Sequence, residues 1–113
     1  MKFRITAIFL ACVLLSACVS SVPVSIANNS GVQLTNVVVS GAGFSESVGS
    51  IAIGGTAAAR VRPPGESQVK VSVEVDGQRY SAMTSERIAN DGANSVVATV
   101  GADFSISIET PAR

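Results

Sequence analysis

The strongest nucleophiles in this sequence are the thiols of Cys12 and Cys18, which both lie near the N-terminus. The chain has no histidine, so no imidazole base is present to deprotonate either thiol. Cys18 follows Ser16 and Ala17, two small residues that let a peptidase approach the backbone. Because a thiolate is a good nucleophile for group transfer, Cys18 is the first candidate for a processed and modified residue.

The N-terminal segment has the composition of a secretory signal. Lys2 and Arg4 give it a positive start, and the apolar run from Ile5 to Leu15 is interrupted only by Thr6. Signal sequences have apolar centres of about 7–15 residues, whereas a helix that spans a bilayer needs ~20. The sequence therefore predicts a cleaved signal-peptide helix over residues 1–17 and no permanent spanning anchor.

The run Leu15-Ser16-Ala17-Cys18 resembles the lipobox of bacterial lipoproteins. The resemblance implies cleavage between Ala17 and Cys18 and a diacylglyceryl group on the Cys18 sulfur, a covalent lipid that is the only cofactor we expect. Such lipoproteins carry more than one acyl chain, and since each buried methylene contributes ~0.8 kcal/mol, the anchor would hold stably in a bilayer. Val19 stands where an aspartate is the usual inner-membrane retention signal, which points to the outer membrane in a Gram-negative cell.

Two alternatives to this assignment remain. An ordinary secretory signal would leave Cys18 unmodified. Cys12 is a rival lipid acceptor, but Phe9 and Leu10 before it fit the lipobox poorly, and too little apolar sequence would remain upstream. We therefore expect lipidation at Cys18.

The mature chain would be short and nearly neutral. Removal of residues 1–17 from the 113 leaves 96, enough for one domain with a core of its own. Loss of Lys2 and Arg4 leaves six basic and eight acidic side chains, a net charge of −2, so nothing in the charge favours nucleic acid as a partner. With Cys12 removed and Cys18 acylated, no disulfide can form.

Ser67 and Lys70 match S-x-x-K, the serine–lysine pattern of penicillin-binding enzymes. That pattern needs the serine at the start of a helix with the lysine one turn later. Here it precedes a valine-alternating strand, in which a spacing of three puts the two side chains on opposite faces. We interpret the match as chance.

The segment Asn90 to Asn94 offers one carboxylate, Asp91, and two amides. Calcium usually takes six or more oxygen ligands, so a plain turn is favoured over a calcium loop. The mature chain would have neither a histidine nor a free thiol to bind zinc, and without histidine no Ser-His-Asp set can be assembled. The sequence therefore predicts no metal site and no catalytic residue.

Arg60 and Arg62 share one face of a predicted strand beside Pro63-Pro64. Residues 18–21 comprise the lipidated cysteine and a short tether. The three residues after Cys18 reach about 10 Å at ~3.3–3.6 Å per residue, so the domain should lie directly on the headgroups. The two arginines are candidate contacts for lipid phosphates or a glycan. The alternative is an ordinary solvated polar face.

Strict alternation gives the clearest secondary structure. The valines from Val69 to Val75 alternate with polar residues, and Asp76-Gly77 is a strong two-residue hairpin signal. This loop predicts three cross-strand pairs: Val75 with Gln78, Glu74 with Arg79, and Val73 with Tyr80. Glu74 and Arg79 would form a surface ion pair of little energetic weight.

The remaining strands are predicted from shorter patterns. Val22 to Ile26 alternates, and Pro23, which cannot donate to a ladder, places this strand at a sheet edge. A change of parity within Val32 to Ser40 predicts a bulge near Thr35-Asn36. Pro64-Gly65 suits a type II turn. Further strands are expected over Phe44–Ile53, Thr56–Arg62, Val96–Val100 and Phe104–Glu109, with a helical turn around Ser85–Ala89.

Together these patterns predict an all-β fold, a small antiparallel β-sandwich of about seven strands. The single domain should cover residues 22–110, with a frayed tail at 111–113. The pattern resembles the immunoglobulin-like modules of bacterial envelopes, although the Cys…Trp…Cys hallmark of true immunoglobulin domains is absent. An up-and-down barrel is the alternative.

Three functions follow from these expectations. The first is a non-enzymatic envelope lipoprotein that binds or scaffolds another envelope component, for example by strand addition at Val22–Ile26. The second is a small enzyme or ligand carrier, which would need a pocket that joins acids such as Asp91 with Asp103 or Glu109. The third is an accessory subunit of a secretion or assembly complex. The non-enzymatic envelope lipoprotein is favoured. Its expected partners are the bilayer, through the acyl chains on Cys18, and an unidentified envelope protein.

Overall fold

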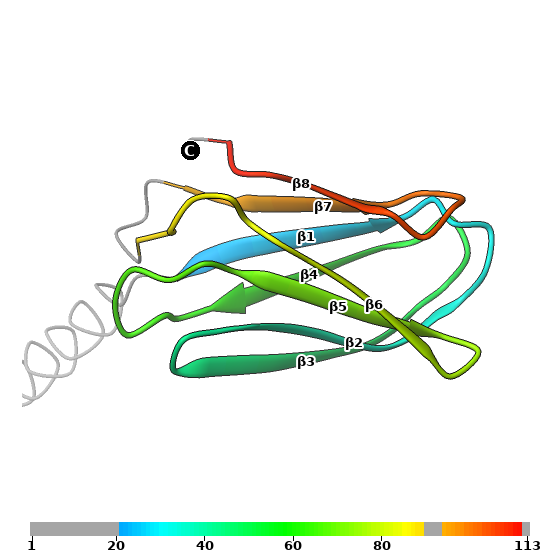
Figure 1. Ribbon diagram of the computed structural model, residues 1–113, viewed down its shortest axis with the longest axis horizontal. Coiled ribbons are helices and arrows are strands. Elements are labelled where there is room, and N and C mark those ends of the chain that lie inside the picture. The colour runs from blue at the N-terminus through cyan, green and yellow to red at the C-terminus, as the bar shows by residue number, and fades with distance from the viewer. Residues whose placement is uncertain (1–20, 90–93, 112–113) are drawn as a thin grey trace, which may run out of the picture.

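The computed structural model describes residues 21–89 and 94–111, and this part of the chain is all-β. Eight strands form two sheets of four that enclose one core (Figure 1). No helix among these residues has the length and apolar character to cross a bilayer. The strands are β1 Val22–Asn28, β2 Leu34–Gly41, β3 Phe44–Ile51, β4 Thr56–Val61, β5 Lys70–Val75, β6 Gln78–Met83, β7 Val96–Val100 and β8 Ile106–Glu109.

The two sheets draw their strands from distant parts of the chain. Sheet A has the order β4-β1-β7-β8 and sheet B the order β3-β2-β5-β6. Every pair of neighbours is antiparallel except β1 and β7, which run parallel. The sandwich is thus confirmed with eight strands, and the prediction of a wholly antiparallel arrangement is wrong at this one pair.

The core is built from alternate residues of both sheets. Valine, isoleucine and leucine supply nearly all of it, because β-branched side chains pack well on a pleated surface. Full burial of such a side chain contributes about 1.5–3 kcal/mol relative to exposure. The buried apolar residues are Val22, Val24, Ile26, Leu34, Val37, Val39, Ile51, Val61, Val69, Val71, Val73, Val75, Ile88, Val96, Ala98 and Val100.

The β5–β6 hairpin is confirmed in its turn and its register. Asp76 and Gly77 both have positive φ, 50° and 77°, as the predicted type of two-residue loop requires. All three predicted cross-strand pairs are present. Tyr80 on the core side also reaches the Phe104 ring at a centroid distance of 5.0 Å.

The irregularity in β2 is confirmed as well. Its register against β5 shifts between Thr35 and Val38, and Asn36 takes a φ of 46°. The extra residue turns Val37 and Val39 toward the core together with Leu34. Β-bulges resolve such parity conflicts by setting two residues opposite one.

The placement of β1 at a sheet edge is wrong. β1 lies inside sheet A between β4 and β7. Pro23 is tolerated because pairing with β7 starts one residue later, at Val24, so Pro23 has a neighbouring strand on one side only. Strand addition at Val22–Ile26 is therefore excluded.

Three local predictions are also wrong. β8 starts at Ile106, because Phe104 has a φ of 63° and belongs to the turn after β7. Ser85–Ala89 forms no helical turn; instead Ile88 makes an isolated bridge with Ser67. Gly65 does not take the positive φ that a type II turn requires of it.

Candidate functional site

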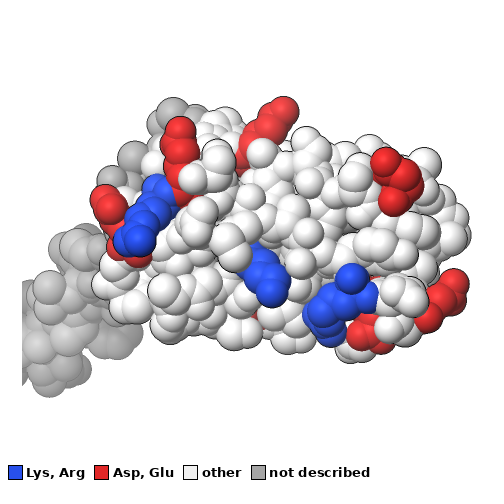
Figure 2. Space-filling model, viewed as in Figure 1, with Lys and Arg blue, Asp and Glu red and all other residues white. Residues whose placement is uncertain are grey.

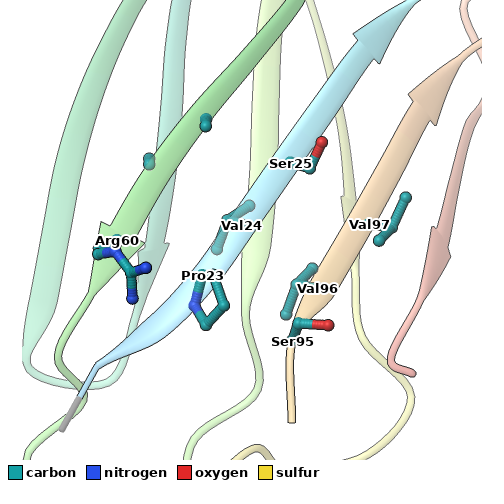
Figure 3. A pocket seen from close by; sticks show the side chains of 9 residues that line it. Pro23, Val24, Ser25, Arg60, Ser95, Val96 and Val97 are labelled. Atoms are coloured by element: carbon teal, nitrogen blue, oxygen red, sulfur yellow. The ribbon is translucent and has the colours of Figure 1, made fainter. Parts of the chain in front are cut away.

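The outer face of sheet A carries a shallow hollow of about 390 Å³ beside the start of β1. Figure 3 shows β4, β1 and β7 side by side here, with Arg60 next to Pro23 and with Val97 on the far strand. The lining residues are Pro23, Val24, Ser25, Ala58, Ala59, Arg60, Ser95, Val96 and Val97.

Short side chains create this hollow. Ser25 lies opposite Ala58 across the β1–β4 ladder, and neither side chain extends far above the sheet. Arg60, opposite Pro23, is the longest side chain in the lining and the only charged one. The hollow is therefore mainly apolar, with a single cation at its rim.

Arg60 also contacts the residue that precedes β1. Its Nη1 donates a hydrogen bond of 3.1 Å to Ser21 Oγ. Among residues 21–89 and 94–111, no carboxylate lies within ion-pair distance of Arg60. A guanidinium has five N–H donors, so most of its hydrogen-bonding capacity is left for another ligand.

Arg60 and Arg62, the two arginines predicted as surface contacts, meet at a second hollow of about 570 Å³ between β3 and β4. Phe44 and Glu46 from β3 line its other side. The Glu46 carboxylate makes this hollow less favourable for an anion than the one on sheet A. The structure thus brings both arginines to one edge of the sandwich.

On the face in Figure 2, basic and acidic side chains lie near one another, and no large patch of a single charge is seen. Glu74 and Arg79 form the predicted ion pair, with an oxygen–nitrogen distance of 3.3 Å and side-chain exposures of 29% and 49%. A pair this exposed contributes about 0–1 kcal/mol. It has the character of an ordinary surface contact.

Ser67 and Lys70 line a third hollow, of about 350 Å³. β5 begins only at Lys70, but burial already alternates from Ser67 onward: Ser67 is buried and Lys70 is half-buried, as expected for side chains that point to opposite sides. The Ser67 hydroxyl accepts from the Ala42 N–H at 2.9 Å and donates to the Gln68 carbonyl at 2.7 Å. This buried serine ties the β2–β3 turn to the segment before β5.

The acids considered for an enzyme site are not brought together. Asp103 lies in the turn between β7 and β8, whereas Glu109 lies at the other end of β8, opposite Val97. The Ser105 hydroxyl and the Ser105 backbone N–H both donate to the Asp103 carboxylate. These bonds, the hydroxyl bond most of all, hold the pKa of that carboxyl below its usual value. Asp91 lies outside the described residues, as do Ala17 and Cys18.

Within the described ranges, no group of three histidine, cysteine, aspartate or glutamate side chains comes together in a way that could hold a metal ion. Asn94 is the one residue of the predicted Asn90–Asn94 turn that the structure describes; the other four lie outside the described residues.

Sequence reasoning did not identify the role of Asn28, the last residue of β1. Asn28 is 0% exposed, and its Nδ2 donates to the carbonyls of Val32, Ile51 and Ala52 at 2.7, 3.2 and 3.1 Å. Its Oδ1 accepts from the Ser30 N–H at 3.1 Å and from the Ser30 hydroxyl at 2.6 Å. The Asn-x-Ser spacing was the available signal, since asparagine commonly bonds to the backbone two residues on.

Comparison with known proteins identifies a fold and no family. No protein-family model matches the chain, and no curated protein matches it. A solved structure with a similar fold is the NMR structure of a protein from Eubacterium rectale, with a TM-score of 0.58 and 12% sequence identity. The similarity covers 81% of this chain and 89% of that one, so the two proteins share an architecture over most of their length.

Proposed function

We propose that this protein is a lipid-anchored envelope protein whose β-sandwich has a non-enzymatic binding or structural role. Cys18 carries the lipid after cleavage behind Ala17, and Val19 directs the protein to the outer membrane in a Gram-negative cell. The sandwich is immunoglobulin-like in type.

The observation that carries the proposal is the distance in sequence between the lipobox and the fold. β1 begins at Val22, and Val22 already pairs with Val61 on β4. Only residues 19–21 lie between Cys18 and that strand. At ~3.3–3.6 Å per residue the tether keeps the start of β1 within about 10 Å of the acylated cysteine, so the domain acts at the bilayer surface.

The edge strand β4 is a candidate site for binding a partner. β4 ends sheet A and pairs with β1 alone among the described residues. Its sequence contains no proline, and Ala57, Ala58 and Ala59 present little bulk to an incoming strand. Exposed strand edges of this kind accept partner strands through backbone hydrogen bonds.

The test is acylation in a bacterial host supplied with an alkyne-tagged fatty acid. The wild-type chain should incorporate the label and float with membranes, Cys18→Ala should lose both properties, and the matched variant Cys12→Ala should keep both. Label retained by Cys18→Ala would refute the proposed anchor.

A second variant tests the destination. In a Gram-negative host, Val19→Asp should move the protein from the outer to the inner membrane fraction without loss of label. An unchanged distribution on a density gradient would show that Val19 does not decide the destination.

A further inference from the structure

We infer that the hollow on the outer face of sheet A binds an anionic phospholipid headgroup through Arg60, so that the sandwich lies with the β4 side of this face against the bilayer. The inference rests on the proposed lipid anchor at Cys18.

The position of Arg60 relative to the anchor is the first step. Its guanidinium is bonded to Ser21, only three residues after Cys18. The chain length therefore keeps the guanidinium on the order of 15 Å or less from the Cys18 backbone, whatever the orientation of the domain. The polar layer of each leaflet is itself ~5–8 Å thick, so Arg60 lies at or next to the level of the phosphates.

The chemistry of the hollow is the second step. An arginine fork binds phosphate oxygens through two parallel N–H donors. Among residues 21–89 and 94–111, Nη1 is the only Arg60 donor seen in a hydrogen bond. The short side chains of Ser25, Ala58 and Val97 leave space beside the guanidinium. A headgroup fits here, with its glycerol and upper acyl segments over the apolar floor.

The charges on the same face set its tilt. Arg60 stands on β4 at one side of the hollow, and Glu109 stands on β8 opposite Val97 at the other side. An anionic surface attracts the first side chain and repels the second. The β4 side of sheet A should therefore lie nearer to the bilayer than the β8 side.

The absence of tryptophan from the chain permits a background-free test. The lipidated protein, with one tryptophan introduced, is reconstituted in vesicles of brominated phosphatidylcholine and phosphatidylglycerol at 7:3. Ala58→Trp places the probe in the hollow, and Ser47→Trp is the matched control on an exposed position of β3 in sheet B. If Ala58→Trp does not fold, Val97→Trp reports on the same hollow.

Fluorescence of Ala58→Trp should be strongly quenched by the brominated lipid, and that of Ser47→Trp should not. When Arg60→Gln is added to Ala58→Trp, the ratio of quenched to unquenched protein should fall about fivefold. This is the change in equilibrium constant expected when one basic side chain is lost from an anionic surface. The charge-matched Arg79→Gln should leave that ratio unchanged. In vesicles without phosphatidylglycerol, the effect of Arg60→Gln should disappear.

Equal quenching of Ala58→Trp and Ser47→Trp, or equal effects of Arg60→Gln and Arg79→Gln, would overturn the inference. Flotation of the same samples separates this failure from failure of the anchor. Protein that floats with vesicles without selective quenching is anchored but does not bind through the hollow. Protein that does not float at all refutes the lipid anchor and the inference with it.

Discussion

Asn28→Ala should destabilise the sandwich severely, although it removes only a small polar side chain. In the wild type, the Asn28 amide joins the end of β1 to the following loop and to the end of β3. The substitution deletes three donated and two accepted hydrogen bonds at a residue that is 0% exposed. Water reaches such a site poorly, so those partners that are themselves buried lose their bonds without replacement.

The magnitude follows from which partners are left buried. The carbonyls of Val32 and Ala52 belong to exposed residues and can turn to water, and the Ser30 hydroxyl keeps its bond to the Val32 carbonyl. The Ile51 carbonyl and the Ser30 N–H lose a buried partner. At about 1–3 kcal/mol for each unsatisfied group, the free energy of unfolding should fall by roughly 2–6 kcal/mol. That is a large part of the ~5–15 kcal/mol typical of a domain.

Urea denaturation of residues 19–113, followed by far-UV circular dichroism, measures this change. A loss of about 3 kcal/mol lowers the midpoint by roughly 1–3 M urea. Asn29→Ala alters the exposed neighbour of the same residue type and should change stability by less than about 0.5 kcal/mol. If both variants unfold at the same midpoint, the buried amide does not stabilise this end of the sandwich.

Two further predictions concern turns. Gly77→Ala should cost about 1–2 kcal/mol in the same denaturation assay because Gly77 has a φ of 77°. Gly65→Ala is the control, because an added Cβ there also meets no atom within 4 Å but φ is not positive. It should be neutral or stabilising. If both substitutions lower the free energy of unfolding equally, the positive φ of Gly77 is not the cause. Ser105→Ala should raise the pKa of Asp103 toward its ordinary value in a carboxyl NMR titration, because the hydroxyl bond that lowers it most is lost. Because the pKa of Asp103 is lowered in the folded protein, this bond stabilises the fold at pH values above the pKa of the unfolded chain. The stabilisation disappears as the pH falls through the pKa of the folded protein. If Ser105→Ala leaves the titration of Asp103 unchanged, the hydroxyl bond does not lower its pKa.

Features of the fold that depend on neighbouring residues were predictable. The alternation before Asp76-Gly77 and the turn itself specify the same register, so Glu74 lies opposite Arg79 as expected. The parity change around Thr35 likewise predicted a bulge. Both predictions rest on the two-residue alternation of side chains along a strand, which can be seen without reference to the rest of the chain.

The pairing of distant segments was not predictable in this way. β1 has β4 and β7 as neighbours, and nothing near Pro23 indicates that Val96 lies beside Val24. The hollow next to Arg60 exists only because these three strands are adjacent. The burial of Asn28 depends equally on Ile51 and Ala52, more than twenty residues away in sequence.

The sequence by itself determined the β-rich character and the one strong hairpin, and it predicts the lipobox and the short tether. Each of these depends on residue types within a few positions of one another. Only the tertiary structure decided that β1 is an inner strand, that Asn28 is buried, and that Arg60 stands beside Ser21 at the rim of a hollow. The reason is that strand order follows from the burial of apolar faces over the whole chain, which no local pattern specifies.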